Sequence, residues 1–336
     1  MKRTWTIALV LALSVLLPFA AFAQGYKIGI YVPGVVAGSP LYEQMVAGAE
    51  RAAKEANASV KVIEAGFNQG EWQEKMTSLA ATGEYDLILS SNGAMPFICA
   101  ETAKVFPKQK FLVVDAYLAG NPQIATLLYN QVEQGYLVGY LGGLVTKSRM
   151  AGATPDLKAG AIVGQQYPAM DKMIIPGYEQ GLKAVDSRIT LDLRVLGNWY
   201  DANKAADLAN SMIDAGVDVI MTASGGANEG VIKAAKARGK YVLYFDANEY
   251  KLAPGTIIGC AVLNQEKAVY ERVKSAIQGK LAYGKAEIVN AKEGYVDFPD
   301  SDPLYTANVP ADVRQKMADV LKKIRAGQIN LQVPQL

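Results

Sequence analysis

The fold is indicated by a pattern that occurs twice in the chain. Residues 85–93 read YDLILSSNG, and residues 217–225 read VDVIMTASG. Each stretch has an Asp near its start, a short apolar run and a small polar loop at its end, and Asp218 follows Asp86 by 132 residues. A short apolar run of this kind is typical of a strand that is buried on both faces of a parallel sheet.

Two further pairs of residues keep almost the same spacing. Gly197 follows Gly66 by 131 residues. Asp246 follows Asp115, also by 131 residues. A nearly constant offset over three anchors indicates two copies of one βαβαβ unit.

Helical patterns alternate with the apolar runs in both copies. The second copy contains them at residues 201–215, where Asp201 would cap the helix, and at 226–237. A further strand and helix precede each copy, at 27–32 and 40–56 and again at 160–163 and 171–184. This order predicts an α/β fold with two doubly wound, Rossmann-like lobes joined by a hinge. Ligands of such sheets bind beyond the carboxyl ends of the strands.

The chain is expected to pass between the lobes more than once. We predict that residues 24–127 and about 248–290 form the first lobe. Residues 128–247 and about 291–336 then form the second lobe. The expected crossings lie near residues 125–130, 246–248 and 289–295, where the last strand of each copy ends and where the chain returns.

The composition argues against catalysis. The 336-residue chain has no His, which removes Ser-His-Asp and Cys-His chemistry and His-containing zinc sites. A net charge of +2 gives no basic surplus for nucleic acid. The glycines at 139–143 lie in a helical pattern and indicate close helix packing rather than a phosphate loop. We therefore expect no enzyme, no metal and no cofactor, and the absence of a heptad run predicts a monomer.

The two cysteines and the N-terminus bear on the compartment. Cys99 and Cys260 each lie in an apolar stretch, which predicts two buried thiols rather than a disulfide. Residues 1–23 have a basic start, an apolar run and the sequence AFA, which together predict a cleaved signal peptide. No Cys follows the apolar run for lipid attachment. A mature protein that begins near Gln24 is expected in the periplasm.

Four short motifs carry a resemblance to a known family. Residues 197–201 read GNWYD and residues 215–220 read AGVDVI, while 136–139 read YLVG and 146–148 read TKS. In this order they resemble motifs of the basic membrane protein family of ABC transporter substrate-binding proteins. The resemblance implies the type I periplasmic binding protein fold, with the permease and ATPase subunits of a transporter as partners. It also implies a small-molecule ligand, because the family contains purine nucleoside receptors.

The chain departs from the family pattern in two places. Family nucleoside receptors carry Asp-x-x-Phe-Asn in the first loop, where residues 38–42 here read GSPLY. They also carry a Lys in a late strand, where residues 260–263 here read CAVL. The resemblance places Asp115 and Asp246 where the family has acidic ligand contacts. These departures leave two ligands open, a purine nucleoside and riboflavin.

The candidate ligand contacts lie in the loops that follow the predicted strands. Trp199 is expected to stack on one face of a flat heterocycle. Tyr42 is expected on the other face, although a packing role in its helix fits equally well, and Tyr200 competes for either place. Asp115 and Asp246 are expected to accept hydrogen bonds from hydroxyl or ring N–H groups. The full expected set is Ser39, Tyr42, Asn92, Asp115, Asn198, Trp199, Tyr200, Ser224, Gly225 and Asp246.

These observations predict an extracytoplasmic solute-binding receptor of an ABC importer. Its ligand would be a planar heteroaromatic compound with a sugar or polyol chain. One alternative is the same receptor signalling to a membrane kinase or chemoreceptor. A second alternative is a secreted hydrolase that uses Asp115 and Asp246 as paired carboxylates.

Overall fold

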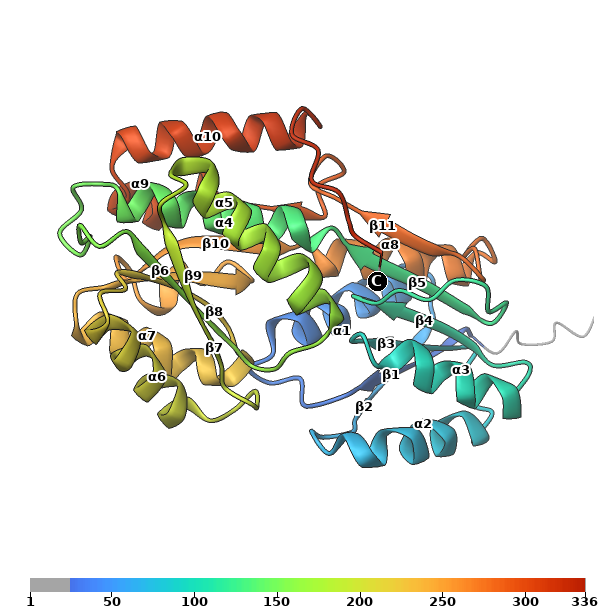
Figure 1. The fold of residues 1–336 in the computed structure, drawn as a ribbon. Helices are drawn as coiled ribbons and strands as arrows, with labels where there is room; N and C mark the ends of the chain where they lie inside the picture. The colour runs from blue at the N-terminus through green and yellow to red at the C-terminus, as the bar shows by residue number, and fades with distance from the viewer. Residues whose placement is uncertain (1–24, 336) are drawn as a thin grey trace, which may run out of the picture.

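The computed structural model describes residues 25–335 and shows two α/β lobes, each built on a six-stranded sheet (Figure 1). The first sheet has the order β11-β5-β4-β3-β1-β2, and the second has the order β12-β10-β9-β8-β6-β7. The strands of the first sheet are β1 (Lys27–Val32), β2 (Ser59–Glu64), β3 (Leu87–Ser91), β4 (Lys110–Val114), β5 (Ile124–Tyr129) and β11 (Ala286–Val289). Those of the second are β6 (Lys158–Val163), β7 (Thr190–Val195), β8 (Val219–Ala223), β9 (Tyr241–Asp246), β10 (Ile257–Leu263) and β12 (Val296–Asp297).

Helices cover the sheets of both lobes (Figure 1). The helices of the first lobe are α1 (Pro40–Glu55), α2 (Trp72–Ala81), α3 (Met95–Val105) and α8 (Gln265–Ile277). Those of the second are α4 (Gln131–Thr146), α5 (Ile175–Val185), α6 (Ala202–Asp214), α7 (Asn228–Ala237), α9 (Pro303–Asn308) and α10 (Ala311–Arg325). A π-helical turn, Met170–Ile174, leads into α5. The predicted pair of doubly wound lobes is confirmed.

Equivalent hydrogen bonds show that the two lobes repeat one backbone design. The amide of Gly66 donates to the carbonyl of Gly34 at 3.0 Å. The amide of Gly197 donates to that of Gly164 at 2.8 Å in the same place of the second lobe. Both bonds tie the end of an outer strand to the end of its neighbour, so the strands of the two lobes end in the same way.

The outer strands differ from the expectation of strands buried on both faces. β2 and β7 lie at the edges of their sheets, and none of their residues is fully buried. Val62 of β2 and Leu193 of β7 are exposed by 37% and 39%. An edge strand has a neighbour on only one side, so its faces are covered less completely than those of the central strands.

The boundary predicted near residue 248 is wrong. β10 pairs with β9 in the second sheet, with Cys260 opposite Tyr244, so residues 248–263 belong to the second lobe. The repeat extends one strand beyond the unit recognised in the sequence, because β5 follows β4 in the first lobe just as β10 follows β9 in the second. The chain returns to the first lobe only at Asn264, and α8 then packs against α1.

Three crossings lie side by side and form the hinge. The chain leaves the first lobe at Asn130, returns at Asn264 and crosses again between β11 and β12. The amide of Asn130 donates to Val289 at 2.7 Å, and that of Asn264 donates to Tyr295 at 2.9 Å. Each of the first two crossings is thus hydrogen-bonded to the third. The helices that follow them, α4 and α8, each pack in the lobe opposite to the strand that precedes them.

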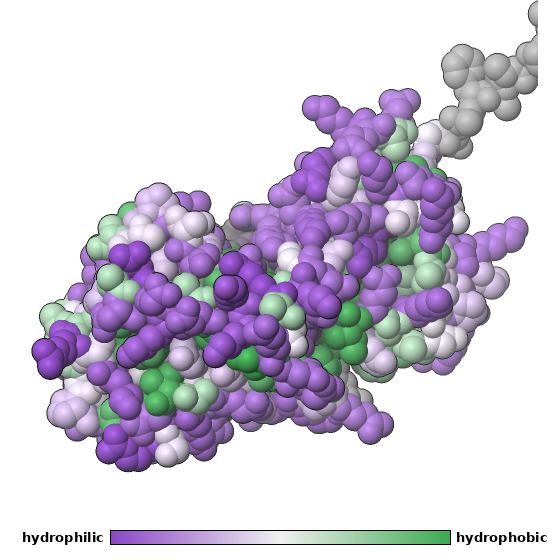
Figure 2. Space-filling model, turned by 90° about the horizontal axis from the view of Figure 1, so that it is seen from above, coloured by the Kyte–Doolittle hydropathy of each residue, from purple (hydrophilic) through white to green (hydrophobic). Residues whose placement is uncertain are grey.

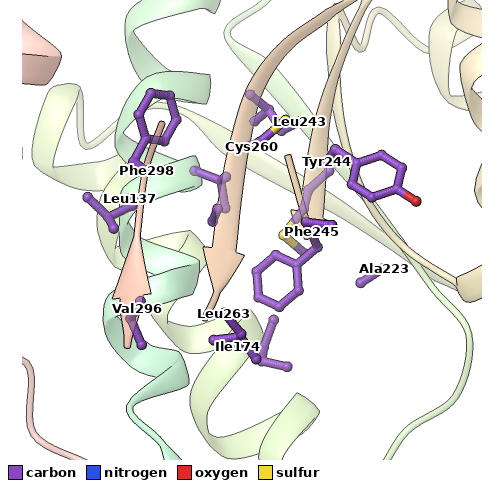
Figure 3. Packing of buried hydrophobic residues seen from close by; sticks show 14 of the residues in the cluster. Leu137, Ile174, Ala223, Leu243, Tyr244, Phe245, Cys260, Leu263, Val296 and Phe298 are labelled. Atoms are coloured by element: carbon purple, nitrogen blue, oxygen red, sulfur yellow. The ribbon is translucent and has the colours of Figure 1, made fainter. Parts of the chain in front are cut away.

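The helix α4 is buried along almost its whole length between the second sheet and α5. A side chain at Gly139 would meet the carbonyl of Tyr178 at 2.1 Å, so this glycine permits the close approach of α5. Close helix packing is therefore confirmed. Figure 3 shows Leu137 of α4 with Cys260 and Phe298 in the apolar core of this lobe.

The surface and the cysteines complete the description. Cys99 and Cys260 are both buried and unbonded, as predicted. The face seen from above is mainly hydrophilic, with separate small apolar areas (Figure 2). Among residues 25–335, none of the helices combines the length and the apolar character that crossing a membrane requires. The predicted signal peptide lies outside the described residues.

Candidate functional site

Three candidate residues share an unusual backbone conformation at the carboxyl ends of central strands. Asn92 follows β3 with a φ of 111°, and Asp115 follows β4 with a φ of 53°. Asp246 ends β9 with a φ of 79°. Only five non-glycine residues of the described chain have a positive φ. Backbone strain of this kind is concentrated at functional sites, where it aims a side chain in a fixed direction.

The two acids belong to opposite lobes and lie close enough for their charges to interact. Burial, together with the negative charge of Asp246, raises the pKa of Asp115 to about 7. Burial likewise raises the pKa of Asp246 to about 6, although a hydrogen bond from Gln134 opposes the rise. Both side chains are half-buried. In the described part of the chain neither acid forms an ion pair, so their charges are uncompensated.

Gln134 is a neighbour of Asp246 that is not among the residues expected from the sequence. It lies on α4 just after the first crossing and is completely buried. Its Nε2 donates to Oδ1 of Asp246 at 2.9 Å and to the carbonyl of Ala261 at 3.3 Å. The glycines and family motifs of this helix lie C-terminal to Gln134, so no local signal identified it.

An aromatic side chain from each lobe, Tyr42 and Tyr167, lies near the acids. The Tyr42 hydroxyl lies against the amide of Asn92, and burial raises its pKa above the ordinary range. Tyr167 lies in the loop after β6. Burial raises its pKa, and so do interactions with Asp115, Asp246 and Tyr42, so Tyr167 lies near all three. Tyr167 is likewise not among the residues expected from the sequence.

Trp199 is held in place by the backbone beneath it. A side chain at Gly164 would meet Cε3 of Trp199 at 2.3 Å, so the indole lies directly against this glycine. The ring of Tyr167 is 6.3 Å from that of Trp199, at 52°. Within residues 25–335, Tyr167 rather than Tyr42 is therefore the aromatic side chain in ring contact with Trp199.

Tyr200 lies at the rim between the lobes. Its ring is 6.3 Å from that of Phe67, which follows β2 in the first lobe, and both side chains are exposed. This ring contact joins the two lobes, so Tyr200 can stabilise their relative position at the rim.

Several predicted contacts have structural roles in the lobe itself. The hydroxyl of Ser224 is buried and lies 2.9 Å from Oδ1 of Asn228, so it does not reach the acids. Oδ1 of Asn198 accepts hydrogen bonds from the amides of Tyr200 and Asp201, which shapes the turn before α6.

The remaining predicted residues flank helix starts and loops. Asp201 caps α6 through the amide of Lys204 at 3.0 Å, as expected. Ser39 precedes α1 without a side-chain capping bond. Gly225 is exposed beside Trp199, with a φ of 60° that favours glycine. Gly225 therefore supplies backbone, not a side chain, to this loop.

The assembled groups are suited to binding. The two carboxylates lie near Tyr42 and Tyr167, and Tyr167 contacts Trp199, which suits a flat ligand that donates hydrogen bonds. Within residues 25–335, no cluster of three or more His, Cys, Asp or Glu side chains could hold a metal ion.

The fold and the placement of the site define a class. Two doubly wound lobes that meet over the carboxyl ends of their strands, joined by a three-stranded hinge, are the architecture of solute-binding proteins. A solute-binding protein of an ABC transporter from Aeropyrum pernix K1 superposes with a TM-score of 0.79 at 21% identity, covering 93% of this chain and 94% of that one. A second one, from Conexibacter woesei, gives 0.66 over 92% and 99% at 20% identity.

The chain belongs to the family described as "ABC transporter substrate-binding protein PnrA-like", whose model matches residues 26–330. The "CD4+ T-cell-stimulating antigen" of Listeria monocytogenes is 26% identical over 75% of this chain and 71% of its own length. The "ABC transporter nucleoside-binding protein BmpA" of Lactococcus lactis is 25% identical over 74% and 71%. The Listeria innocua antigen is 31% identical, but over only 47% of this chain and 42% of its own length.

Proposed function

We propose that this protein captures a flat, heteroaromatic solute with a sugar or polyol chain for an ABC importer, outside the cytoplasmic membrane. Riboflavin and purine nucleosides are the two ligands that fit this description. The observation that carries the proposal is the pair of uncompensated acids, Asp115 and Asp246, set between aromatic side chains of both lobes.

The charge of the site selects among ligands. Two carboxylates without a cation favour a ligand that donates hydrogen bonds and carries no negative charge. Ribose, ribityl and ring N–H groups are such donors. A phosphate group would be repelled, and so flavin mononucleotide and purine nucleotides are expected to bind much more weakly than riboflavin and nucleosides.

The aromatic residues would hold the flat part of the ligand. We propose that Trp199 covers one face of the ring and that Tyr42 or Tyr167 covers the other. Stacking is worth about 1–3 kcal/mol for each face, by analogy with base stacking. The name of the Lactococcus relative is compatible with a nucleoside. The departures in the first loop, where Tyr42 replaces the expected residues, support riboflavin.

Mass spectrometry of ligand retained by the purified protein tests the proposal directly. Titrations with riboflavin, guanosine, inosine and adenosine, followed by tryptophan fluorescence, should then give a quench with at least one of them. Trp199→Ala should weaken binding by about 10- to 100-fold with the fold intact. Comparison of Tyr42→Ala with Tyr167→Ala identifies the second stacking residue. The proposal is lost if none of the four compounds binds, or if a phosphorylated form binds as tightly as its parent.

The transport partners are part of the same proposal. A permease pair and an ATPase would receive the loaded receptor, which we expect to act as a monomer. Reconstitution with the transporter subunits encoded beside the gene should give ligand uptake that depends on this protein. A receptor that serves only a membrane kinase or chemoreceptor would give no uptake in that assay.

A further inference from the structure

Gln134 occupies a position that connects the hinge with the ligand site. It lies four residues after Asn130, where the chain first crosses between the lobes. Its side chain is buried, and it reaches Asp246 at the end of β9. Asp246 in turn lies close enough to Asp115 of the other lobe for their charges to interact. One amide group therefore links the crossing helix to one of the two acids.

The orientation of this amide is informative. Its nitrogen donates to Asp246 and to the carbonyl of Ala261, while its oxygen is buried without a hydrogen-bond partner in the described structure. An unpaired buried oxygen is costly. The opposite orientation would cost more, because it would place that oxygen against a carboxylate and a carbonyl. The amide nitrogen of Gln134 therefore points to Asp246 and donates a hydrogen bond to it.

We infer that Gln134 is a positioning residue of the ligand site, which fixes one oxygen of Asp246 and leaves the other to accept a hydrogen bond from the ligand. The part of this inference that concerns the ligand rests on the proposed function, and the part that concerns Asp246 does not. The hydrogen bond between Gln134 and Asp246 is present in the protein by itself.

The surroundings of Asp246 make this donor important. The titratable groups that interact with its charge are Asp115 of the β4 end, Tyr129 of β5, Tyr167 after β6 and Tyr244 of β9. None of these four is a cation. Gln134 is the one side-chain hydrogen-bond donor to this carboxylate within residues 25–335, and its bond lowers the pKa of Asp246 against the effect of burial.

The helix provides a matched control. Gln131 lies one turn earlier on α4, is almost completely buried and also has an oxygen without a partner. It forms no side-chain hydrogen bond to Asp246 in the described chain. Gln131→Leu and Gln134→Leu therefore remove the same group from the same helix, and only the second removes the donor to Asp246. Gln134→Glu replaces the donor with a third acid beside Asp246 and Asp115.

The first measurement needs no ligand. The Asp246 carboxyl is followed by carbon-13 NMR in the ligand-free, full-length mature protein, with Asp246→Asn to assign its signal. Gln134→Leu should move its titration to higher pH, and Gln134→Glu should move it further. Gln131→Leu should leave it unchanged. If Gln134→Leu and Gln131→Leu titrate alike, Gln134 does not position Asp246 and the inference is overturned.

The second measurement is riboflavin and guanosine binding as a function of pH. Gln134→Leu should weaken binding by about 10-fold at pH 8, with a smaller loss at pH 5, because Asp246 is then protonated in both proteins. Equal losses at both pH values would indicate a merely structural role and would contradict the inference. A shifted carboxyl titration with no binding of either compound would instead uphold the positioning of Asp246 and count against the proposed function.

Discussion

The two lobes repeat one backbone but treat their acids differently. Asp115 and Asp246 end equivalent strands with the same left-handed conformation. Asp246 is held by Gln134, whereas no protein group in the described chain donates a hydrogen bond to the carboxylate of Asp115. The second lobe thus presents a fixed acceptor, and the first lobe presents an acceptor that only a ligand or water can satisfy.

The loops beside these acids differ in the same sense. In the second lobe, Ser224 is buried in a network with Thr222 and Asn228. In the first lobe, Asn92 is half-buried next to Tyr42, and its Oδ1 accepts a hydrogen bond from the amide of Ala94 at 2.9 Å. Its amide lies against the Tyr42 hydroxyl. The second lobe therefore holds both its loop hydroxyl and its acid by internal hydrogen bonds, whereas the acid of the first lobe, Asp115, has no such donor in the described chain.

The largest effect is expected from Gly164→Ala in the second lobe. The added carbon would lie 2.3 Å from the ring of Trp199, so the indole must move away from its place. A displacement of about 1 Å at a positioning contact can cost a factor of about 100. Affinity for the retained ligand, measured by calorimetry, should fall by about that factor.

Gly93→Ala in the first lobe is the control for this change. No atom lies within 4 Å of the added carbon there, and the affinity should be unchanged within about 2-fold. If Gly164→Ala also binds as tightly as the parent, Trp199 is not part of the ligand site.

Asp115→Asn should weaken ligand binding by about 10- to 100-fold and stabilise the ligand-free protein at alkaline pH. The pKa of Asp115 is about 7 in the folded protein and 3.8 ordinarily, so the folded state binds the proton more tightly. The stability that this carboxyl gives below about pH 4 is lost as the pH rises through 7. An amide does not titrate and loses nothing.

Urea unfolding at pH 4, 6 and 8 measures this effect. The variant should exceed the parent by on the order of 2 kcal/mol at pH 8, a figure reduced because solvent reaches the carboxyl, and by almost nothing at pH 4. Asp246→Asn should gain less, because the pKa of Asp246 is only about 6 and Gln134 already donates a hydrogen bond to its carboxylate. A larger gain at Asp246 than at Asp115 would reverse the comparison of the two lobes.

Asn92→Gly and Ser224→Ala separate ligand contact from internal packing. Glycine keeps the positive φ of Asn92 and removes its amide, so the affinity should fall by about 5- to 10-fold with little change in stability. Ser224→Ala should cost about 1 kcal/mol of unfolding free energy and leave the affinity unchanged. Calorimetry and urea unfolding of both variants check these values, and a loss of affinity in Ser224→Ala would restore this side chain to the site.

Much of the fold could be predicted from the sequence because its signals are local. The apolar runs before Asp115 and Asp246 mark buried strands, and their constant spacing marks the duplication. The limit of the duplication was harder to recognise, since β10 and β5 share little beyond apolar character. Their pairing with β9 and β4 is a tertiary property, and so the crossing at Asn264 was placed too early.

The positions of four candidate residues were predictable because they follow repeated strands, and their contact with a ligand stays a prediction. Asn92, Asp115, Trp199 and Asp246 follow such strands, and the structure brings them toward the place where the lobes meet. Gln134 is brought to Asp246 by the packing of a helix from 112 residues away, which no local pattern encodes. Ser224 has the same strand-end position as Asn92, but a neighbour four residues on, Asn228, takes its hydroxyl into the interior.

The smallest effects are expected from two lysines that donate to equivalent carbonyls, and these test the repeat itself. Nζ of Lys75 donates to the carbonyl of Ala65 at 2.8 Å, and Nζ of Lys204 donates to that of Leu196 at 2.7 Å. Both bonds tie a helix to the end of the outer strand of its lobe. Lys75→Met and Lys204→Met should therefore each cost about 1 kcal/mol of unfolding free energy. The exposed ion pair of Lys75 with Glu71 adds little to this.

The double variant extends this test to the independence of the lobes. Because the two lysines lie in different lobes and share no partner, its cost should equal that of the two single variants within about 0.5 kcal/mol. Ligand affinity should be unchanged in all three, since neither lysine contacts the acids or the aromatic side chains of the site. Urea unfolding and calorimetry measure both quantities. If only one of the two single variants lost unfolding free energy, the two hydrogen bonds would not stabilise their lobes equally. The similarity of the two copies would then be limited to their backbone.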